Sequence, residues 1–263
     1  MNRNDLTGRN TIINKEIKTD YNNYSFTAVE EVQNIAIAVV VTAGAAYLFY
    51  EDIRGMIFCP VVWKFVRKLR RQKKQKERQR VLAKQFQDGM QSVCTALLAG
   101  FSMENAWKEA EREMEVLYGK QAWITQEFQS MNQAVLFHIP LEQTLQDFAR
   151  RSGVEDILSF SEVFLFAKRQ GANFVRIIEN TTYHMKDKQE TEEEIQILAA
   201  SKKLEQKIMN VIPVLILTYL KITSGDYLST LYRNLFGVLF MTGCLAAYGA
   251  ALVLSDRILD IRV

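Results

Sequence analysis

Cysteine and proline are scarce in this chain of 263 residues, which contains three of each. The cysteines, Cys59, Cys94 and Cys244, are widely spaced and odd in number, which excludes a disulfide framework and any C-x-x-C metal or redox site. The few prolines fit long helices, because proline inside a helix removes a backbone hydrogen bond. The chain is 48% hydrophobic and 24% charged, so it is neither disordered nor collagen-like.

The patterns that carry common catalytic chemistry are also missing. No G-x-x-x-x-G-K-[ST] loop occurs, so we do not expect nucleotide hydrolysis by a P-loop, and residues 171–174 (GANF) fit the end of a helix better than a phosphate loop. The only histidines, His138 and His184, are too far apart for a His-rich metal site. No serine or cysteine has a base and an orienting acid at a recognisable spacing. We therefore predict a protein that is not an enzyme, with no catalytic, cofactor-binding or metal-binding residues and no cofactor.

One acidic cluster, Glu190 with Glu192, Glu193 and Glu194, could suggest paired acid–base carboxylates. Consecutive residues on an exposed helix fan around its axis and do not converge on one point. A solvated helix face is the simpler interpretation, and a surface that binds a partner is the alternative.

Long runs without charge are the strongest positive signal. Residues 235–254 (LFGVLFMTGCLAAYGAALVL) contain no charged residue and, at 1.5 Å per residue, would span about 30 Å, one hydrocarbon core. A shorter run, 208–220, contains Pro213 and ends at Lys221, whose ammonium can reach the interface. The turn-rich segment TSGDYLSTLYRN lies between them. These features predict a C-terminal transmembrane hairpin over 208–254 and a tail over 255–263.

A further apolar region lies near the N-terminus. Residues 34–50 (NIAIAVVVTAGAAYLFY) form a third candidate span, too far from the N-terminus and too poor in basic residues to be an ordinary signal peptide. The stretch GMIFCPVVWKFV, interrupted by Pro60 and Lys64, fits either a short second span or an interfacial helix. We therefore predict a membrane region over 31–66, preceded by a poorly structured segment over 1–30.

Basic residues follow this region directly. Residues 67–84 (RKLRRQKKQKERQRVLAK) carry ten Lys or Arg and one acid, Glu77. The positive-inside rule places this segment and the domain after it in the cytoplasm. A nucleic-acid patch is the alternative, but the net charge of only +3 and the position beside an apolar region argue against it. Attraction to anionic lipid headgroups is a natural additional role for the segment.

Residues 85–207 show helical periodicity without a transmembrane run. We expect Gly100, Gly119, Gly153 and Gly171 to end helices, Ser102 to cap one, and Pro140 to stand at the first position of another. The expected apolar faces, six in number, run over Leu82–Leu97, Met103–Leu117, Ile124–Val135, Leu141–Phe148, Ile157–Ala167 and from near Asn173 onward.

The last of these helices has no break before the run at 208. Between His184 and Glu194 it is polar all round, with possible i,i+4 pairs of Lys186 with Glu190 and of Lys188 with Glu192. We interpret this stretch as a stalk. The predicted fold class is all-α: an integral membrane protein with a cytoplasmic bundle of about six helices, over 85–207 with its stalk, and a C-terminal transmembrane hairpin.

Four segments resemble the type II secretion system F domain family. They are FQDGMQSVCTALLAGFSMENAWKEAEREM, IPLEQTLQDFARRSGVEDILSFSEVFLFAKRQGANFVRIIENTTYHMKDK, LAASKKLEQKIMNVIPVLILTYL and the tail LFGVLFMTGCLAAYGAALVLSDRILDIRV. The resemblance covers about residues 80–263, some 70% of the chain, and consists of helix order and small-residue turns. Larger family members contain two F domains and this chain contains one, which is similar to the shorter Tad (tight adherence) platform subunits. The family often has Gly-Val-Pro where this chain has His138-Ile139-Pro140.

The resemblance implies a multi-pass platform protein of the bacterial inner membrane, with its main domain in the cytoplasm. Such a platform couples a cytoplasmic hexameric ATPase to the extraction and assembly of pilin subunits, and itself does no chemistry. The implied partners are a secretion or pilus ATPase, a second platform subunit or a second copy of the chain, pilin subunits and the lipid bilayer, but no nucleic acid.

Two other classes of protein remain as alternatives. One is a membrane-anchored scaffold or signalling protein. The other is a small transporter, which is less favoured because the run over 235–254 contains only Thr242, Cys244 and Tyr248 as polar residues.

Overall fold

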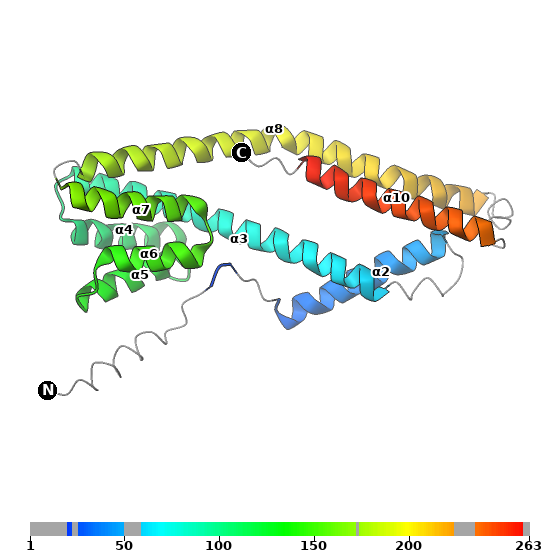
Figure 1. Ribbon diagram of the computed structural model, residues 1–263, viewed down its shortest axis with the longest axis horizontal. Helices are drawn as coiled ribbons and strands as arrows, with labels where there is room; N and C mark the ends of the chain where they lie inside the picture. The colour runs from blue at the N-terminus through cyan, green and yellow to red at the C-terminus, as the bar shows by residue number, and fades with distance from the viewer. Residues whose placement is uncertain (1–19, 23–25, 50–58, 172–173, 224–234, 260–263) are drawn as a thin grey trace, which may run out of the picture. The chain divides into compact units, whose positions relative to one another are not determined.

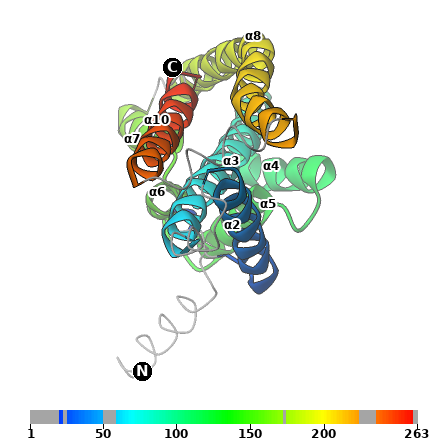
Figure 2. The ribbon, with the colours of Figure 1, turned by 90° about the vertical axis from the view of Figure 1, so that its right-hand side faces the viewer.

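The computed structural model describes residues 20–22, 26–49, 59–171, 174–223 and 235–259. These residues form eight helices and no strand (Figure 1 and Figure 2), which confirms the all-α prediction. The helices are α2 (Ala28–Phe49), α3 (Cys59–Leu98), α4 (Met103–Tyr118), α5 (Trp123–Leu136), α6 (Leu141–Ser152), α7 (Glu155–Gln170), α8 (Phe174–Thr223) and α10 (Leu235–Leu259).

The chain divides into two compact units. The first, called here the bundle unit, comprises residues 1–25 and 72–189, and the second comprises residues 26–71 and 190–263. Helices α3 and α8 each contribute one part to the first unit and one part to the second. The bundle unit therefore contains helices α4 to α7 together with the end of α3 and the start of α8.

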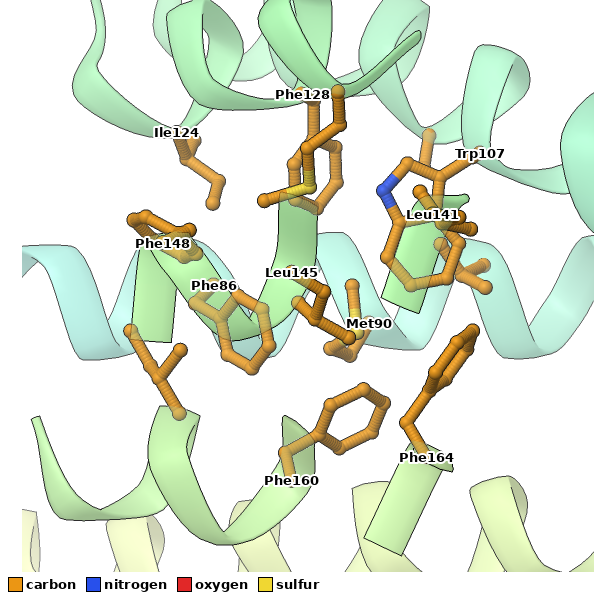
Figure 3. Close-up of a cluster of buried hydrophobic side chains, with 14 of the residues drawn as sticks. Phe86, Met90, Trp107, Ile124, Phe128, Leu141, Leu145, Phe148, Phe160 and Phe164 are labelled. Carbon is orange, nitrogen blue, oxygen red and sulfur yellow. The ribbon is translucent and has the colours of Figure 1, made fainter. Parts of the chain in front are cut away.

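The bundle unit is built around an aromatic core (Figure 3). Phe86 of α3, Trp107 of α4, Phe128 of α5 and Phe160 and Phe164 of α7 are all fully buried. The rings of Trp107 and Phe164 meet edge to face with centroids 5.5 Å apart, and those of Phe86 and Phe160 do so at 5.4 Å. Aromatic pairs in this arrangement add to the stabilisation that comes from burying their area.

Close packing of α3 against α5 depends on a glycine. A Cβ atom on Gly89 would lie 2.6 Å from Cζ of Phe128, a distance that real Cβ atoms do not adopt. Glycine inside a helix normally costs stability. Here it allows the fully buried ring of Phe128 to sit directly against the backbone of α3.

The predicted helix ends are found close to their expected places. The Oγ atom of Ser102 accepts a hydrogen bond from the backbone N–H of Asn105 at 3.4 Å, as expected of an N-cap. Pro140 precedes α6 by one residue instead of being its first residue. The expected glycine stops all have positive φ: Gly100, Gly119, Gly153 and Gly171.

The prediction that Leu117 is buried is wrong. Leu117 was expected on the buried face of its helix, but 58% of it is exposed. In this last turn of α4, Tyr118 packs against the core instead, and its hydroxyl donates a hydrogen bond to Asp88 of α3. Of the other members of that predicted face, Met103 is half-buried and the rest, among them Trp107 and Met114, are buried.

The polar stretch of α8 begins against the bundle. Met185 packs against the core, and Nζ of Lys188 lies 2.7 Å from Oδ1 of Asp156 in α7. The stalk that the sequence predicts from His184 onward therefore packs on α7 as far as Lys188. Beyond that point α8 continues as one helix to Thr223, with Pro213 inside it.

In the second unit, α2 is held to the first turns of α3 by polar contacts. Nη1 of Arg70 donates to Oδ1 of Asn34 at 2.7 Å, and Nε of Arg67 lies 3.2 Å from Oε1 of Glu31. The hydroxyl of Tyr248 in α10 donates to the carbonyl oxygen of Asn210 in α8.

Two sequence predictions, the N-terminal membrane region and the C-terminal hairpin, concern segments described only in part. Residues 59–66 are the first turns of α3 and run without a break into the basic segment 67–84, while residues 50–58 lie outside the described residues. The predicted hairpin turn lies outside them over 224–234. Within the part of the chain that the structure describes, no helix combines the length and the apolar character needed to cross a membrane.

Candidate functional site

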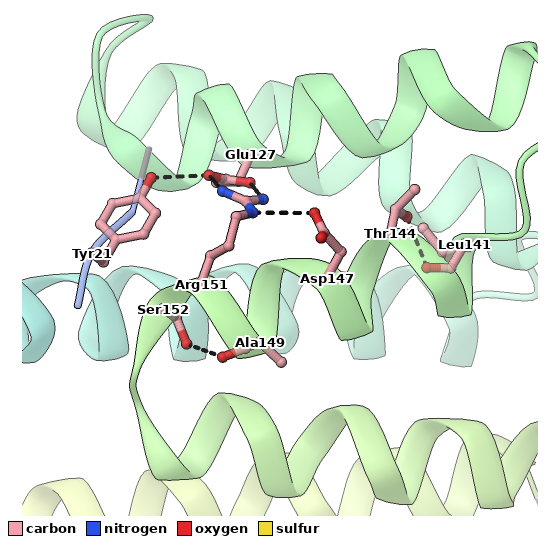
Figure 4. A network of polar contacts seen from close by, with 8 residues as sticks. All are labelled: Tyr21, Glu127, Leu141, Thr144, Asp147, Ala149, Arg151 and Ser152. Atoms are coloured by element: carbon pink, nitrogen blue, oxygen red, sulfur yellow. Dashed lines mark hydrogen bonds and ion pairs between the residues drawn. The ribbon is translucent and has the colours of Figure 1, made fainter. Parts of the chain in front are cut away.

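A buried ion pair is the most distinctive polar feature of the bundle unit (Figure 4). Arg151, in the last turn of α6, places Nη2 2.7 Å from Oε2 and Nη1 2.9 Å from Oε1 of Glu127 in α5. The two side chains are only 17% and 10% exposed. This bidentate geometry gives two parallel charge-assisted hydrogen bonds, which are among the stronger polar contacts in proteins.

Two more side chains complete the network around Glu127. Nε of Arg151 donates to Oδ2 of Asp147 at 3.1 Å, one helical turn earlier in α6. The hydroxyl of Tyr21 donates to Oε1 of Glu127 at 3.0 Å (Figure 4). Tyr21 is 98% buried, although its neighbour Asn22 is exposed.

Tyr21 is fixed by its backbone as well as by its side chain. Its N–H donates to the carbonyl oxygen of Arg151 at 3.0 Å, and Nδ2 of Asn22 donates to the carbonyl oxygen of Arg150 at 3.3 Å. These bonds satisfy carbonyl groups at the end of α6, which have no partner inside the helix. We expected residues 1–30 to be poorly structured, but the structure buries Tyr21 and begins α2 at Ala28.

Arg78 of α3 contacts Tyr21 through its guanidinium group. Its guanidinium lies 4.9 Å from the ring centroids of both Tyr21 and Trp123, within the range of cation–π attraction. We call the five residues Tyr21, Arg78, Glu127, Asp147 and Arg151 the Tyr21 cluster. It joins the N-terminal segment to three helices, α3, α5 and α6.

Gly153 leaves room for this segment where α6 ends. Its φ of 64° lies in the left-handed region, and a Cβ atom there would collide with the side chain of Asn22. Nε2 of Gln79 in α3 donates to the carbonyl oxygens of Ser152 at 3.4 Å and of Gly153 at 3.2 Å. The glycine thus serves both the helix end and the close approach of the N-terminal segment.

The environment of the Tyr21 cluster shifts two pKa values away from neutrality. Burial raises the pKa of Tyr21 well above its usual value, and the negative charge and hydrogen bond of Glu127 raise it further. Burial disfavours the charged form of Arg151, but the hydrogen bonds and charges of Glu127 and Asp147 outweigh it and raise the pKa of the guanidinium. Near neutral pH Tyr21 is therefore protonated and Arg151 charged, so neither side chain serves as an acid–base group.

A second tyrosine and a buried thiol are equally unsuited to chemistry near pH 7. Burial, the hydrogen bond to Asp88 and the charge of that carboxylate raise the pKa of Tyr118 to about 12. Burial, with a smaller effect of the charge of Glu179, raises the pKa of the Cys94 thiol, which disfavours the reactive thiolate. All three cysteines are free, as the sequence predicts.

The residues singled out from the sequence are not brought together. His138 is exposed in the connection between α5 and α6, and His184 is exposed on α8 with its ring against that of Tyr183. The four glutamates at 190–194 lie along α8 and are exposed or half-buried. No three His, Cys, Asp or Glu side chains among the described residues are placed to hold a metal ion.

Sequence reasoning missed the Tyr21 cluster, although one signal was present. Glu127 stands three residues after Ile124 and four before Met131, so a carboxylate occupies the apolar face of α5. A charge at such a position predicts a buried partner. Nothing in the sequence around Tyr21 distinguishes it from the neighbouring polar residues.

The bundle unit also exposes large apolar side chains where two of its helices end. Helices α4 and α5 pack together and are joined by a short connection. Leu98 and Phe101 after α3 are 58% and 50% exposed, and Leu136 and Phe137 at the end of α5 are 67% and 63% exposed. Large apolar side chains exposed to this degree are candidates for contact with another protein.

The chain matches no protein-family model, no curated protein and no solved structure.

Proposed function

We propose that the chain is an inner-membrane platform subunit of a type IV or Tad-like pilus, or of a type II secretion assembly. In this role it couples a cytoplasmic ATPase to the extraction and assembly of pilin subunits. The proposal starts from the resemblance to the type II secretion system F domain family over about residues 80–263. It is supported by a bundle whose helices follow the expected order and end close to the expected capping residues.

The observation that carries the proposal is the length of α8. This helix extends over 50 residues as one element, from Phe174 to Thr223, and Ile178 near its start is buried in the bundle core. A continuous helix transmits displacement along its axis, because each turn is held to the next by backbone hydrogen bonds. Force applied by an ATPase to the bundle unit would thus reach the second unit along α8.

Membrane insertion is part of the proposal and is supported by the surface of the second unit. Apolar side chains are exposed on α2, on the end of α8 and on α10, including Val40 of α2 at 71%, Leu215 of α8 at 61% and Leu239 of α10 at 68%. Exposing so much apolar surface to water is unfavourable, whereas lipid accommodates it. We place α2, the end of α8 and α10 in the bacterial inner membrane, and the basic segment with the bundle unit in the cytoplasm.

The chain acts in this proposal through contacts and not through catalysis. We assign contact with a protein partner such as the ATPase to the exposed apolar side chains where α3 and α5 end, namely Leu98, Phe101, Leu136 and Phe137. Pilin subunits and a second platform subunit, or a second copy of the chain, would contact the membrane helices.

Deletion and complementation test the proposed function. We expect deletion of the gene in its own host to abolish surface pilin or secreted substrate, while pilin remains in the membrane fraction. The wild-type chain should restore assembly, and a Leu98→Ser/Phe137→Ser variant should not, although it accumulates normally. Normal pilin assembly and secretion in the deletion strain would refute the platform role and leave a membrane-anchored scaffold or signalling protein as the alternative.

A further inference from the structure

We propose that the outward face of the first turns of α3 is a docking surface for anionic phospholipid, with Lys64 and Lys68 binding the headgroup phosphate. This inference deepens the proposed function, since it rests on the second unit lying in or against a membrane. It adds a defined site and a preference for lipid charge, neither of which follows from membrane insertion alone.

Helical spacing sorts the side chains of this segment into sectors. Lys64 and Lys68 are four residues apart and therefore share one face of the helix, and both are exposed. Phe65 and Leu69, again four apart, form the adjacent sector and are 49% and 44% exposed. A basic sector beside an apolar one is the pattern of a helix that lies at a membrane surface.

The opposite side of the same turns is occupied by α2. Nη1 of Arg70 bonds to Asn34, which is fully buried, and Arg67 forms its ion pair with Glu31. Trp63 on this side is half-buried, and the guanidinium of Arg67 lies 5.4 Å from its ring centroid. These contacts fix the rotation of α3 about its axis, so that Lys64, Phe65, Lys68 and Leu69 face away from α2.

An apolar hollow lies next to this face. It measures about 470 Å³ and is lined by Phe65 of α3 and by Gly249, Ala250, Val253 and Leu254 of α10. A Cβ atom added to Gly249 would meet no other atom within 4 Å, so the small side chains leave this space open. The lining carries no charged residue, which suits a lipid acyl chain. Lys64 and Lys68, which would bind the headgroup phosphate, lie close to Phe65 in the sequence.

The combination of features favours anionic lipid over other polyanions. Binding of a nucleic-acid phosphate backbone requires only the lysines and does not explain the exposed phenylalanine and leucine beside them. A phospholipid contains both a phosphate and an acyl chain, so it can contact both kinds of side chain. Near a membrane surface each lysine strengthens attachment to anionic lipid by about fivefold. Loss of both lysines should therefore weaken the preference for anionic lipid by about 25-fold at low ionic strength.

Fluorescence quenching by brominated lipid tests the site directly. The full chain is purified in detergent and reconstituted into phosphatidylcholine vesicles that contain a small fraction of either brominated phosphatidylglycerol or brominated phosphatidylcholine. Because Trp63 lies on the α2 side, the probe is a tryptophan in place of Phe65 on the proposed face, and its signal is the difference between Phe65→Trp and the unchanged chain. We expect the anionic quencher to reduce this signal at least twofold more than the zwitterionic one, and high salt to reduce the difference.

Two double variants, each of which removes two positive charges, distinguish an effect of the proposed site from an effect of net charge. Lys64→Gln/Lys68→Gln should bring the ratio of the two quenching effects close to one. Lys108→Gln/Arg169→Gln, which removes two exposed charges from the bundle unit, should leave the ratio unchanged. A ratio near one in the Phe65→Trp chain with both lysines present, a ratio unaffected by the first variant, or an equal loss in the second would each overturn the proposal. So would RNA binding that depends on the two lysines without any lipid preference.

Alkaline carbonate extraction of the same vesicles reports on the proposed function separately. A chain that resists extraction but shows no preference for the anionic quencher would refute the lipid site and leave the membrane platform intact. A chain that carbonate removes but that shows the lysine-dependent preference would support the lipid site and refute insertion of the second unit.

Discussion

Tyr21 is a residue far from the bundle helices in sequence whose side chain is buried among them. Glu127 and Arg151 are largely buried, and removing charges from water is costly unless every remaining hydrogen-bonding position is used. Tyr21 supplies one of these bonds through its hydroxyl, and its ring lies edge to face against Trp123 and Phe148, with centroids 6.3 Å away in each case. Tyr21 is therefore part of the bundle core.

We predict that Tyr21→Phe lowers the free energy of unfolding by about 1.5–3 kcal/mol at pH 7, the usual range for losing a hydrogen bond to a charged group. The raised pKa of Tyr21 adds a pH dependence. Above about pH 10 the unfolded chain loses the tyrosine proton while the folded chain keeps it, so wild-type stability falls as pH rises. Denaturation of the full chain at pH 8 to 11.5 measures both effects.

The variant lacks this titration, so the difference between wild type and Tyr21→Phe should shrink above pH 10. Tyr118 titrates in both proteins and cancels in the comparison. A difference in stability that stays constant up to pH 11.5 would show that Tyr21 is not buried against Glu127.

Trp107 provides the strongest test of the core. It is fully buried between the rings of Phe128 and Phe164. Trp107→Ala should lower the free energy of unfolding by about 3–5 kcal/mol, the usual cost of truncating a large aromatic side chain in a core. Val116→Ala on the same helix, at a side chain that is 85% exposed, should change it by less than about 0.5 kcal/mol. Similar small effects of the two variants would place Trp107 at the surface.

His138 occupies a backbone conformation that suits glycine. Its φ is 60°, and it is the only non-glycine residue with positive φ in the described part of the chain. A side chain in this conformation costs about 1 kcal/mol through contact with the neighbouring carbonyl group.

We therefore predict that His138→Gly raises the free energy of unfolding by about 0.5–1 kcal/mol. His138→Ala, which keeps a Cβ atom, should not. Chemical denaturation of the full chain distinguishes the two variants. A stabilising effect of alanine equal to that of glycine would assign the gain to loss of the imidazole and not to the backbone.

At the scale of single elements, the sequence predicts much of the fold. Helix ends follow from local chemistry: a serine hydroxyl at Ser102 and positive φ at Gly119 and Gly153 act within a few residues, so spacing reveals them. Burial depends on neighbours in space. Leu117 has the spacing of a core residue, yet Tyr118 takes its place because Asp88 of α3 offers a hydrogen bond there.

The continuity of α8 can be tested where the bundle unit ends. Gln189 is the last residue of that unit and stands in the polar stretch of the helix. Proline there removes a backbone hydrogen bond and costs about 3 kcal/mol locally, which breaks or kinks the helix. If α8 transmits force, Gln189→Pro should abolish pilin assembly or secretion while the protein still accumulates in the membrane fraction.

Gln189→Ala preserves the helix and should assemble pilin normally. Surface pilin or secreted substrate is the measurement, with membrane-fraction abundance as the control for folding. Normal assembly by the proline variant at normal abundance would show that α8 acts only as a tether, and the platform role itself would stand.

At the scale of the whole molecule, the sequence separates the apolar segments from the charged ones but does not reveal long-range pairing. Tyr21 contacts Glu127, which is 106 residues away, and Lys221 donates to the carbonyl oxygen of Tyr47, 174 residues away. Such contacts depend on how helices assemble, and no local pattern encodes them. Charge distribution along the chain, in contrast, is a property of the sequence and predicts orientation directly.

The last prediction concerns that orientation. The basic segment over 67–84 carries ten Lys or Arg and directly follows the first apolar region, so the bundle unit should lie in the cytoplasm. Reporter fusions near Gly119 and Gly153, in the connections α4–α5 and α6–α7, should give cytoplasmic activity, and a fusion near Asp226 should report the outer side. Neutralising Arg67, Lys68, Arg70 and Arg71 together should weaken this bias, because positive charge beside the first span sets orientation. Periplasmic activity of the fusion at Gly153 in the wild type would reverse the topology, and with it the side from which an ATPase could reach the bundle.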